Sequence, residues 1–171
     1  MTIRRAVAGE AEAISDLALR SKAHWGYSAE FLEMCRAELT YTPERCGSPG
    51  MWVAAQGDEL LGFYLIETPT HETAPLEGEL AALFVAPERI GAGLGGRLLR
   101  HALTQAEASG IQRLTLDADP GAEPFYRHHG ARRIGQTPSG SIPGRTLPRM
   151  AFDLHERDSH EHDGEERITS R

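Results

Sequence analysis

The sequence predicts one α+β domain built on a mixed sheet of about seven strands. Its 171 residues are 40% hydrophobic, which is enough for a single core. A strand, a helix and a second strand follow one another over residues 79–119, and a crossover of this kind joins parallel strands with a right-handed connection. The strands expected over 51–56 and 60–68 suit an antiparallel hairpin. We therefore expect a mixed sheet that contains a parallel pair.

The N-terminal quarter predicts one strand and two helices. Residues 2–7 form the first expected strand. Residues 10–23 and 29–39 are expected to be helices, because apolar residues recur there at helical spacing. Ser28 is the expected N-cap of the second helix.

The middle of the chain predicts three strands. Residues 51–56 and 60–68 are expected to form an antiparallel hairpin, because Gly57-Asp58 between them suits a tight turn. Residues 79–86 form a continuous apolar run, which is typical of a strand buried on both faces. This run is the expected central strand.

The second half of the chain begins with a long helix and ends with strands. Apolar residues form a helical stripe that starts at Leu94, and Gly110 is a favoured stop for that helix. The elements expected after it are a strand over 113–119, a short helix over 122–129 and closing strands over 132–136 and 148–154.

The C-terminal stretch, residues 155–171, contains six acids and three arginines and is expected to be a disordered charged tail. The folded domain is then residues 1–154, with a net charge of -4 against -7 for the whole chain. His155, His160 and His162 suggest a metal site. A chain without fixed geometry is a poor place for one, so we expect a solvated tail and no metal.

Composition and charge argue against several classes of function. No apolar run approaches the roughly 20 residues that span a bilayer, and the first residues lack the apolar segment of a secretory signal. We therefore expect a cytoplasmic protein with no membrane partner. The acidic net charge, without a basic stripe, argues against a nucleic-acid partner. Cys35 and Cys46 have neither C-x-x-C nor zinc spacing, so we expect no disulfide framework and no structural metal.

A glycine-rich loop joins the central strand to the long helix. It carries the spacing G-x-G-x-x-G at Gly91, Gly93 and Gly96, which brings backbone N–H groups at a helix start against an anion such as a pyrophosphate. A P-loop is excluded, because Arg97-Leu98 follows where Lys-Ser/Thr is required. A Rossmann domain fits badly, because four residues separate the strand from the glycines and few βα units can follow. A glycine turn without a ligand is the remaining alternative.

The wider context resembles the GNAT superfamily of acetyl-CoA-dependent N-acyltransferases. The residues that carry this resemblance are Leu83-Phe-Val-Ala-Pro87, the glycine loop, Asp119-Pro-Gly-Ala122 and Phe125-Tyr126. The strong part of the match covers residues 79–130. The resemblance implies a mostly antiparallel sheet with a splayed central parallel pair, helices on both faces and acetyl-CoA as co-substrate.

The resemblance also implies how the coenzyme is held. The amides of the glycine loop would bind the pyrophosphate, and the strand before it would pair with the pantetheine arm. The implied coenzyme-binding residues are Leu83, Phe84, Val85, Arg89, Ile90, Gly91, Ala92, Gly93, Leu94, Gly95, Gly96, Asp119, Ala122 and Phe125.

The sequence departs from the family pattern at three places. Ile90 stands where an Arg or Gln is usual, Asp119 stands where an Asn is common, and Ala131 replaces an aromatic residue. An ionised Asp119 accepts hydrogen bonds but cannot donate them.

Two residues are candidates for proton transfer. Tyr126 is at the position of the family's usual general acid, and an ordinary packed tyrosine is the alternative. Glu79 is a candidate base for the attacking amine. It begins the central strand, and strict alternation would place it on one face with Ala81, Leu83 and Val85. A solvated carboxylate at a strand end is the alternative use of Glu79.

The acceptor side is the least defined part of the prediction. Trp25 and Tyr27 lie in the connection between the first two helices, which the resemblance places over the acceptor, although core packing is an equal alternative. His24 is a weaker candidate, and His71 and Glu72 would reach an acceptor only if their loop folds inward. The acidic body favours a cationic acceptor weakly.

The expected activity is transfer of an acetyl group from acetyl-CoA to a primary amine, on a small molecule or at a protein N-terminus, by direct attack without a covalent intermediate. Two alternatives stay open. One is a non-catalytic acyl-CoA-binding regulatory or interaction module, and the other is a nucleotide-binding protein that prefers NAD. A homodimer is a further candidate assembly, without a residue to support it.

Overall fold

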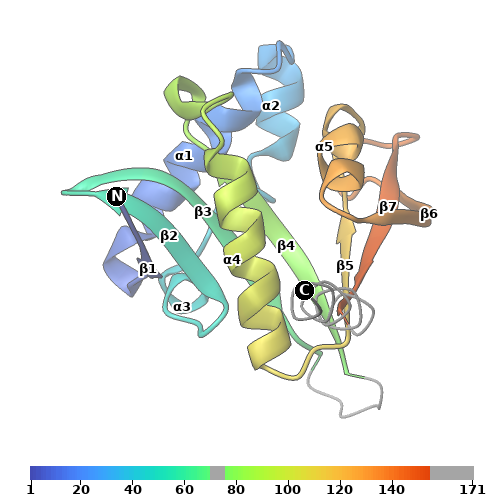
Figure 1. The fold of residues 1–171 in the computed structure, drawn as a ribbon. Helices are drawn as coiled ribbons and strands as arrows, with labels where there is room; N and C mark the ends of the chain where they lie inside the picture. The colour runs from blue at the N-terminus through green and yellow to red at the C-terminus, as the bar shows by residue number, and fades with distance from the viewer. Residues whose placement is uncertain (70–75, 155–171) are drawn as a thin grey trace.

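The computed structural model describes residues 1–69 and 76–154 and contains one seven-stranded sheet. The strand order is β1-β2-β3-β4-β5-β7-β6, and all neighbours are antiparallel except β4 and β5 (Figure 1). This confirms the predicted mixed sheet with a central parallel pair. The strands are β1 Thr2–Arg5, β2 Met51–Gln56, β3 Glu59–Glu67, β4 Glu77–Val85, β5 Arg113–Asp117, β6 Arg132–Pro138 and β7 Thr146–Asp153.

Five α-helices connect the described strands. They are α1 Ala11–Ala23, α2 Ala29–Cys35, α3 Pro43–Cys46, α4 Leu94–Ala108 and α5 Glu123–His128. Single turns of 3-10 helix, named η1 to η3, precede α1, α4 and α5 at Ala8–Glu10, Pro87–Arg89 and Pro120–Ala122. No helix in residues 1–69 or 76–154 combines the length and the apolar composition needed to cross a bilayer.

Local hydrogen bonds explain two helix starts. Ser28 Oγ accepts from the Phe31 amide at 3.1 Å, so the predicted N-cap of α2 is confirmed. The prediction that α2 continues to residue 39 is wrong, since the helix ends at Cys35. The short helix α3 was not expected. Thr42 caps it by accepting from the Arg45 amide at 3.2 Å, and Pro43 occupies its first position.

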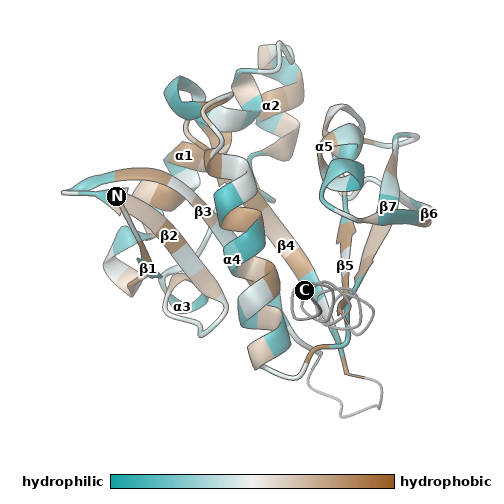
Figure 2. Ribbon diagram, in the orientation of Figure 1, coloured by the Kyte–Doolittle hydropathy of each residue, from teal (hydrophilic) through white to brown (hydrophobic). Residues whose placement is uncertain are grey.

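The sheet separates two apolar cores. One core, called the α4 core, lies between α4 and the sheet and includes Leu61, Leu80, Leu98, Leu99, Leu103, Leu114, Leu116, Met150 and Phe152. The other, called the α1 core, lies on the opposite face and includes Ile14, Leu17, Ala18, Met51, Val53, Phe63, Leu65 and Ala82. Figure 2 shows hydrophobic residues along β3 and β4 and alternating hydrophobic and hydrophilic bands around α4. Helices therefore cover both faces of β3 and β4.

β4 contains a bulge that changes which side chains share a face. Ile66 of β3 pairs with Leu80, whereas the next β3 residue, Leu65, pairs with Ala82. Ala81 is therefore an extra residue on β4 with no partner of its own in that ladder. Leu80 belongs to the α4 core and Ala82 to the α1 core, so the alternation is reset at this point.

The bulge overturns one prediction. Leu83 and Val85 pack against the α4 core, whereas Glu79 precedes the bulge and is adjacent to Leu80 of the same core. Glu79 therefore points to the face opposite α4, together with Ala82, and the predicted common face of Glu79 with Ala81, Leu83 and Val85 is wrong. Strict period-two alternation fails because one residue is inserted between them.

The parallel pair separates soon after it forms. β4 and β5 pair only at Glu77 with Arg113, Gly78 with Leu114 and Glu79 with Thr115. Beyond this point Figure 1 shows the two strands diverging, with α5 above the end of β5. The expected splay is confirmed, and we call the space between the diverging strands the split.

The predicted tail, residues 155–171, and the candidates His71 and Glu72 lie outside the described residues. The division into a domain over 1–154 and a tail stays a prediction.

Candidate active site

The glycine loop presents backbone amides at the start of α4. Gly91 and Gly93 have φ values of 85° and 84°, and a Cβ at either position would meet nothing within 4 Å. Gly93 is the N-cap of α4 and makes no side-chain cap, and no acidic residue lies in the first turn. The first amide to bond back is that of Arg97, to the Gly93 carbonyl at 3.2 Å. The amides before it have no partner within the helix and lie at its positive end.

The segment before the glycines is held by its own backbone. The Arg89 amide donates to the Ala86 carbonyl at 2.8 Å, and the Ala92 amide donates to the Arg89 carbonyl at 3.3 Å. The side chains of Arg89 and Ile90 are partly buried, whereas Gly91, Ala92 and Gly93 are exposed. The exposed turn is therefore the part of the loop that is open to a ligand.

The free edge of β4 leads directly to this loop. Residues 80–85 pair with β3 on one side, but on the other side the ladder with β5 stops at Glu79 within the part of the chain that the structure describes. Such an edge can add an extended chain by backbone hydrogen bonds. Leu83 and Val85 line it on the α4 side, and Phe84 packs toward the α1 core.

α5 places two aromatic residues beside the glycine loop. A Cβ at Gly95 would lie 3.6 Å from the Phe125 ring, which is ordinary contact, and the rings of Phe125 and Tyr126 meet edge to face with centroids 5.1 Å apart. Ala122, at the end of η3, packs against the same α4 core. Tyr126 is buried, and burial together with the nearby charge of Asp119 raises the pKa of its hydroxyl. The hydroxyl is therefore protonated at neutral pH.

A charged group lies on the opposite face, where the strands begin to diverge. Arg149 Nη1 lies 3.0 Å from Asp117 Oδ1 and 3.8 Å from Glu79 Oε1, and its Nη2 donates to Thr115 Oγ1 at 3.1 Å. We call Glu79, Thr115, Asp117 and Arg149 the Arg149 cluster. It brings the predicted base to the face away from α4, on the other side of the sheet from Tyr126.

A second charged group lies above the first, where β5 ends. Asp119 Oδ2 accepts from the hydroxyl of Tyr27 at 2.7 Å, from Lys22 at 3.0 Å and from Arg145 at 3.4 Å. The Tyr27 ring is stacked on Phe31 with centroids 4.2 Å apart. We call Lys22, Tyr27, Phe31, Asp119 and Arg145 the Asp119 cluster. It connects α1 and α2 to the β5–α5 and β6–β7 connections.

The electrostatics of this cluster follow from its contacts. Burial opposes ionisation of Asp119, but the hydrogen bonds from Tyr27 and Lys22 outweigh it, so the pKa of Asp119 is lowered. Burial and the hydrogen bond to Asp119 raise the pKa of Tyr27. Asp119 is therefore a carboxylate and Tyr27 a neutral phenol across the physiological range.

The two predicted acceptor residues occupy different environments. Tyr27 lies in the Asp119 cluster, whereas the Trp25 side chain is 61% exposed and meets the ring of His24 edge to face at 5.5 Å. Sequence reasoning missed Lys22, Phe31, Arg145 and Arg149. The sequence offered one signal for these residues: Lys22 is the only lysine of the chain.

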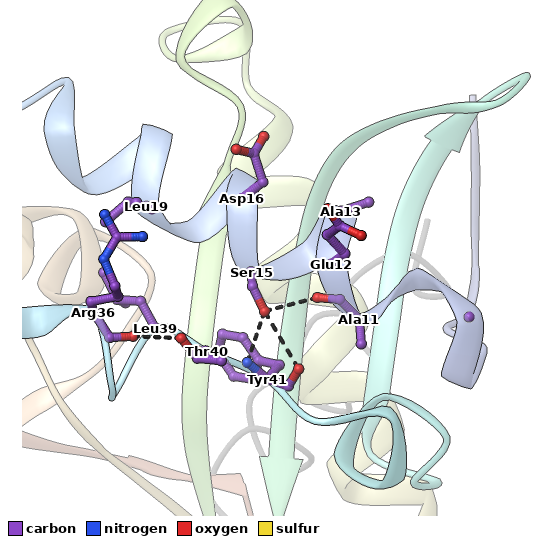
Figure 3. Close-up of a pocket in the computed structure, with 11 residues that line it drawn as sticks. Ala11, Glu12, Ala13, Ser15, Asp16, Leu19, Arg36, Leu39, Thr40 and Tyr41 are labelled. Carbon is purple, nitrogen blue, oxygen red and sulfur yellow. Dashed lines mark hydrogen bonds between the residues drawn. The ribbon is translucent and has the colours of Figure 1, made fainter.

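Two pockets lie away from these groups. A pocket of about 720 Å³ lies between α1 and the segment after α2, where Ser15 Oγ donates to the Ala11 carbonyl and accepts from the Tyr41 amide, both at 2.8 Å (Figure 3). A second pocket of about 410 Å³ lies beside α5 and is lined by Pro120 and Glu123 among others. No predicted site residue lines either pocket. In residues 1–69 and 76–154 no group of three or more His, Cys, Asp or Glu is placed to hold a metal ion.

Comparison with known proteins agrees on one family. The acetyltransferase (GNAT) family model matches residues 15–131. No curated protein matches the sequence closely enough to count as a relative.

Solved structures agree on the fold. An N-acetyltransferase from Thermoplasma acidophilum in complex with coenzyme A has a TM-score of 0.66 and 20% identity, over 89% of this chain and 98% of that one. A GCN5-related N-acetyltransferase from Rhodopseudomonas palustris has a TM-score of 0.69 and 21% identity, over 89% and 94%. A Salmonella typhimurium protein with acetyl-CoA as its cofactor has a TM-score of 0.63 and 21% identity, over 90% and 94%. Since the family model also spans more than half of the chain, the chain belongs to the GNAT acetyltransferase family.

Proposed function

We propose that this protein transfers the acetyl group of acetyl-CoA to a primary amine by direct attack, without a covalent intermediate. The observation that carries the proposal is the free edge of β4 beyond Glu79, which leads without interruption to the uncapped amides at the start of α4. The edge can pair with an extended chain, and the amides can donate hydrogen bonds to an anion. The order of these two features along the chain matches a ligand with a linear arm and a pyrophosphate.

The residues present fit coenzyme A. The solved neighbours from Thermoplasma acidophilum and Salmonella typhimurium hold coenzyme A and acetyl-CoA. In this chain the backbone of Leu83 to Val85 would pair with the pantetheine arm, and the amides of the glycine loop would bind the pyrophosphate. Ile90 offers no polar side chain for a phosphate, so the backbone carries that contact. The open space over Gly91 and Gly93 leaves room for it.

Acetyl-CoA supplies a thioester carbonyl for attack by the amine and a thiolate as leaving group. Tyr126 suits the role of general acid, because its raised pKa keeps the proton on the hydroxyl until a basic thiolate develops. Glu79 suits the role of general base, because its carboxylate can take the amine proton directly or through a water.

The two roles lie on opposite faces of the sheet. Tyr126 belongs to the α4 core, on the face of the glycine loop, whereas Glu79 points to the other face. The acceptor amine would therefore approach from the face of α1 and α2 and attack across the split. This separation supports direct attack, because Tyr126 would then protonate the leaving thiolate while Glu79 takes the proton of the attacking amine.

Two measurements test the proposal. Acetyl-CoA at about 100 times its dissociation constant should add roughly 2.7 kcal/mol to the free energy of unfolding, measured by thermal shift beside coenzyme A and NAD. Free thiol should then be released from acetyl-CoA in the presence of a panel of primary amines. Stabilisation without thiol release would favour a non-catalytic acyl-CoA-binding module, and stabilisation by NAD alone would overturn the acyltransferase assignment.

A further inference from the structure

The Asp119 cluster carries more positive than negative charge. Lys22 and Arg145 share the single carboxylate of Asp119, so the cluster has a formal charge of +1. All three side chains are largely enclosed, at 17%, 20% and 26% of full exposure. The surplus charge is therefore screened less than it would be on an open surface.

Part of the hydrogen-bonding capacity of Arg145 is unused. Both of its side-chain hydrogen bonds in residues 1–69 and 76–154 are made by Nη2, one to Tyr27 and one to Asp119. Its Nε and Nη1 therefore have no hydrogen-bond partner in the described part of the chain. The N–H groups of Nε and Nη1 are therefore available to donate charge-assisted hydrogen bonds to an anion.

The aromatic pair fixes the two cations. The Lys22 ammonium lies 5.2 Å from the Tyr27 ring centre, and the Arg145 guanidinium lies 5.0 Å from that of Phe31. Glycine at position 140 lets the β6–β7 connection approach the turn after α2 closely, because a Cβ there would overlap Glu38. The cluster is thus built by packing between separate segments as well as by charge.

The two charged clusters lie on one face of the sheet. Leu114, Leu116 and Ala118 belong to the α4 core, so the residues that alternate with them point away from α4. Those residues include Asp117 of the Arg149 cluster and Asp119. Two residues of extended chain place the Cα atoms of Asp117 and Asp119 about 7 Å apart.

The charges of the two clusters are opposite in sign. The Arg149 cluster combines Glu79 and Asp117 with one arginine and has a formal charge of -1. It contains the proposed base at the foot of the split, whereas the +1 cluster lies where β5 ends. An acceptor on this face meets a group that takes a proton from an amine and, farther along, a group that binds an anion.

From this arrangement we infer that the acceptor is an aminocarboxylate: a primary amine that also carries a carboxylate, bound by Arg145 and Lys22. This inference rests on the proposed function and specifies its acceptor. It differs from the weak expectation of a cationic acceptor, which came from the net charge of the whole domain. A site responds to the charges that face it, and those of the Asp119 cluster favour an anion.

Matched acceptors test the inference. Thiol release would be measured with phenylalanine, phenylalaninamide and phenethylamine, and with the corresponding methionine series. These compounds keep the side chain and change only the carboxylate. The wild-type protein should prefer the free acids by at least tenfold in kcat/KM, after correction for the fraction of unprotonated amine.

Variants link that preference to the cluster. Arg145→Gln and Lys22→Gln should each reduce the preference for the acids at least tenfold through KM, and Arg145→Lys should retain part of it. The KM for acetyl-CoA should not change. Arg36→Gln is the matched control, because Arg36 is an exposed arginine paired with Glu33 on α2. A thermal melt of each variant separates loss of recognition from loss of folding.

The outcomes separate the two proposals. Acetylation of amides and plain amines as fast as acids would overturn the aminocarboxylate inference and leave the proposed transferase function standing. The same holds if the preference survives in Arg145→Gln and Lys22→Gln. If no amine of any kind caused thiol release from acetyl-CoA, both proposals would be overturned.

Discussion

The two faces of the sheet at the split are built from different chemical groups. On the α4 face the groups near the split are backbone amides, apolar side chains such as Leu83 and Val85, and the neutral phenol of Tyr126. On the opposite face they are charged side chains in two clusters. A ligand held by backbone and apolar contacts is recognised by its shape and phosphates. A ligand held by charged side chains is selected by its own charges, so the acceptor face sets specificity.

The largest expected effect on activity comes from removing the proposed general acid on the α4 face. Tyr126→Phe should lower kcat by about 100- to 10,000-fold, the usual contribution of a positioned general acid. The ring remains in the core, so the dissociation constant of acetyl-CoA should stay within twofold. Single-turnover kinetics and a coenzyme titration measure the two quantities separately.

Unchanged turnover in Tyr126→Phe would remove this residue from the mechanism and leave it a packing residue. Phe125→Leu is a useful companion. This variant removes the ring that contacts Gly95 and keeps the hydroxyl of Tyr126. It should therefore weaken coenzyme binding more than it slows the chemical step.

On the acceptor face, the corresponding test is Glu79→Gln. We expect kcat to fall about 100-fold and the acidic limb of the pH profile of kcat/KM to flatten, because the base is lost. Glu77→Gln is a matched control. Glu77 lies two residues earlier on β4, 3.7 Å from Arg113, much as Glu79 lies 3.8 Å from Arg149. An identical pH profile in the two variants would exclude Glu79 as the base.

The same difference explains what the sequence could predict. The strand over residues 51–56, the long helix from Leu94 and the glycine loop were predicted because each depends on local chemistry: alternation, an apolar stripe, or glycine at positive φ. The coenzyme side of the site is made mostly of such segments. It could therefore be proposed from one stretch of about 50 residues.

The acceptor side could not be predicted in this way. Tyr27 and Arg145 are hydrogen-bonded although 118 positions separate them, and no local sequence pattern predicts such a contact. The bulge at Ala81 is similar, because a single inserted residue reverses the direction of Glu79 without a signal in an apolar run. Tertiary packing decides both features.

Within the α4 face, the glycine loop can be tested against a matched glycine elsewhere. Gly93 and Gly57 both have positive φ, 84° and 60°, and open space around the position of a Cβ. Valine at either site should cost at least about 1–2 kcal/mol of stability through backbone strain. Only Gly93→Val should also place side-chain atoms beside the helix amides, so acetyl-CoA should bind it at least tenfold more weakly.

Chemical denaturation and coenzyme titration of Gly93→Val and Gly57→Val provide the comparison. Equal loss of stability with loss of binding confined to Gly93→Val would support the phosphate role of the loop. Full coenzyme affinity in Gly93→Val would show that this end of α4 does not bind the coenzyme.

The smallest expected effect concerns the response of the two faces to pH. On the α4 face, His101 Nδ1 lies 2.8 Å from the hydroxyl of Tyr64, and burial lowers the pKa of His101 below its ordinary value of 6.5. The unfolded chain then binds more protons than the folded chain as pH falls below about 6.5. This contribution to stability is complete above that pH and is lost as pH falls through the folded pKa. On the other face, the lowered pKa of Asp119 gives a contribution that is lost only below its ordinary value of 3.8.

The two windows can be separated by urea unfolding between pH 7.5 and 5.0, a range that includes the ordinary pKa of histidine, 6.5, and lies above that of Asp119, 3.8. Wild type should lose a modest part of its free energy of unfolding across this range, and His101→Gln should lose less. His128→Gln, at an exposed position on α5, should follow the wild-type slope. A slope in His101→Gln equal to that of wild type would mean that His101 is not the group that couples the α4 face to pH. The faces would then differ in ligand recognition but not in their response to acid.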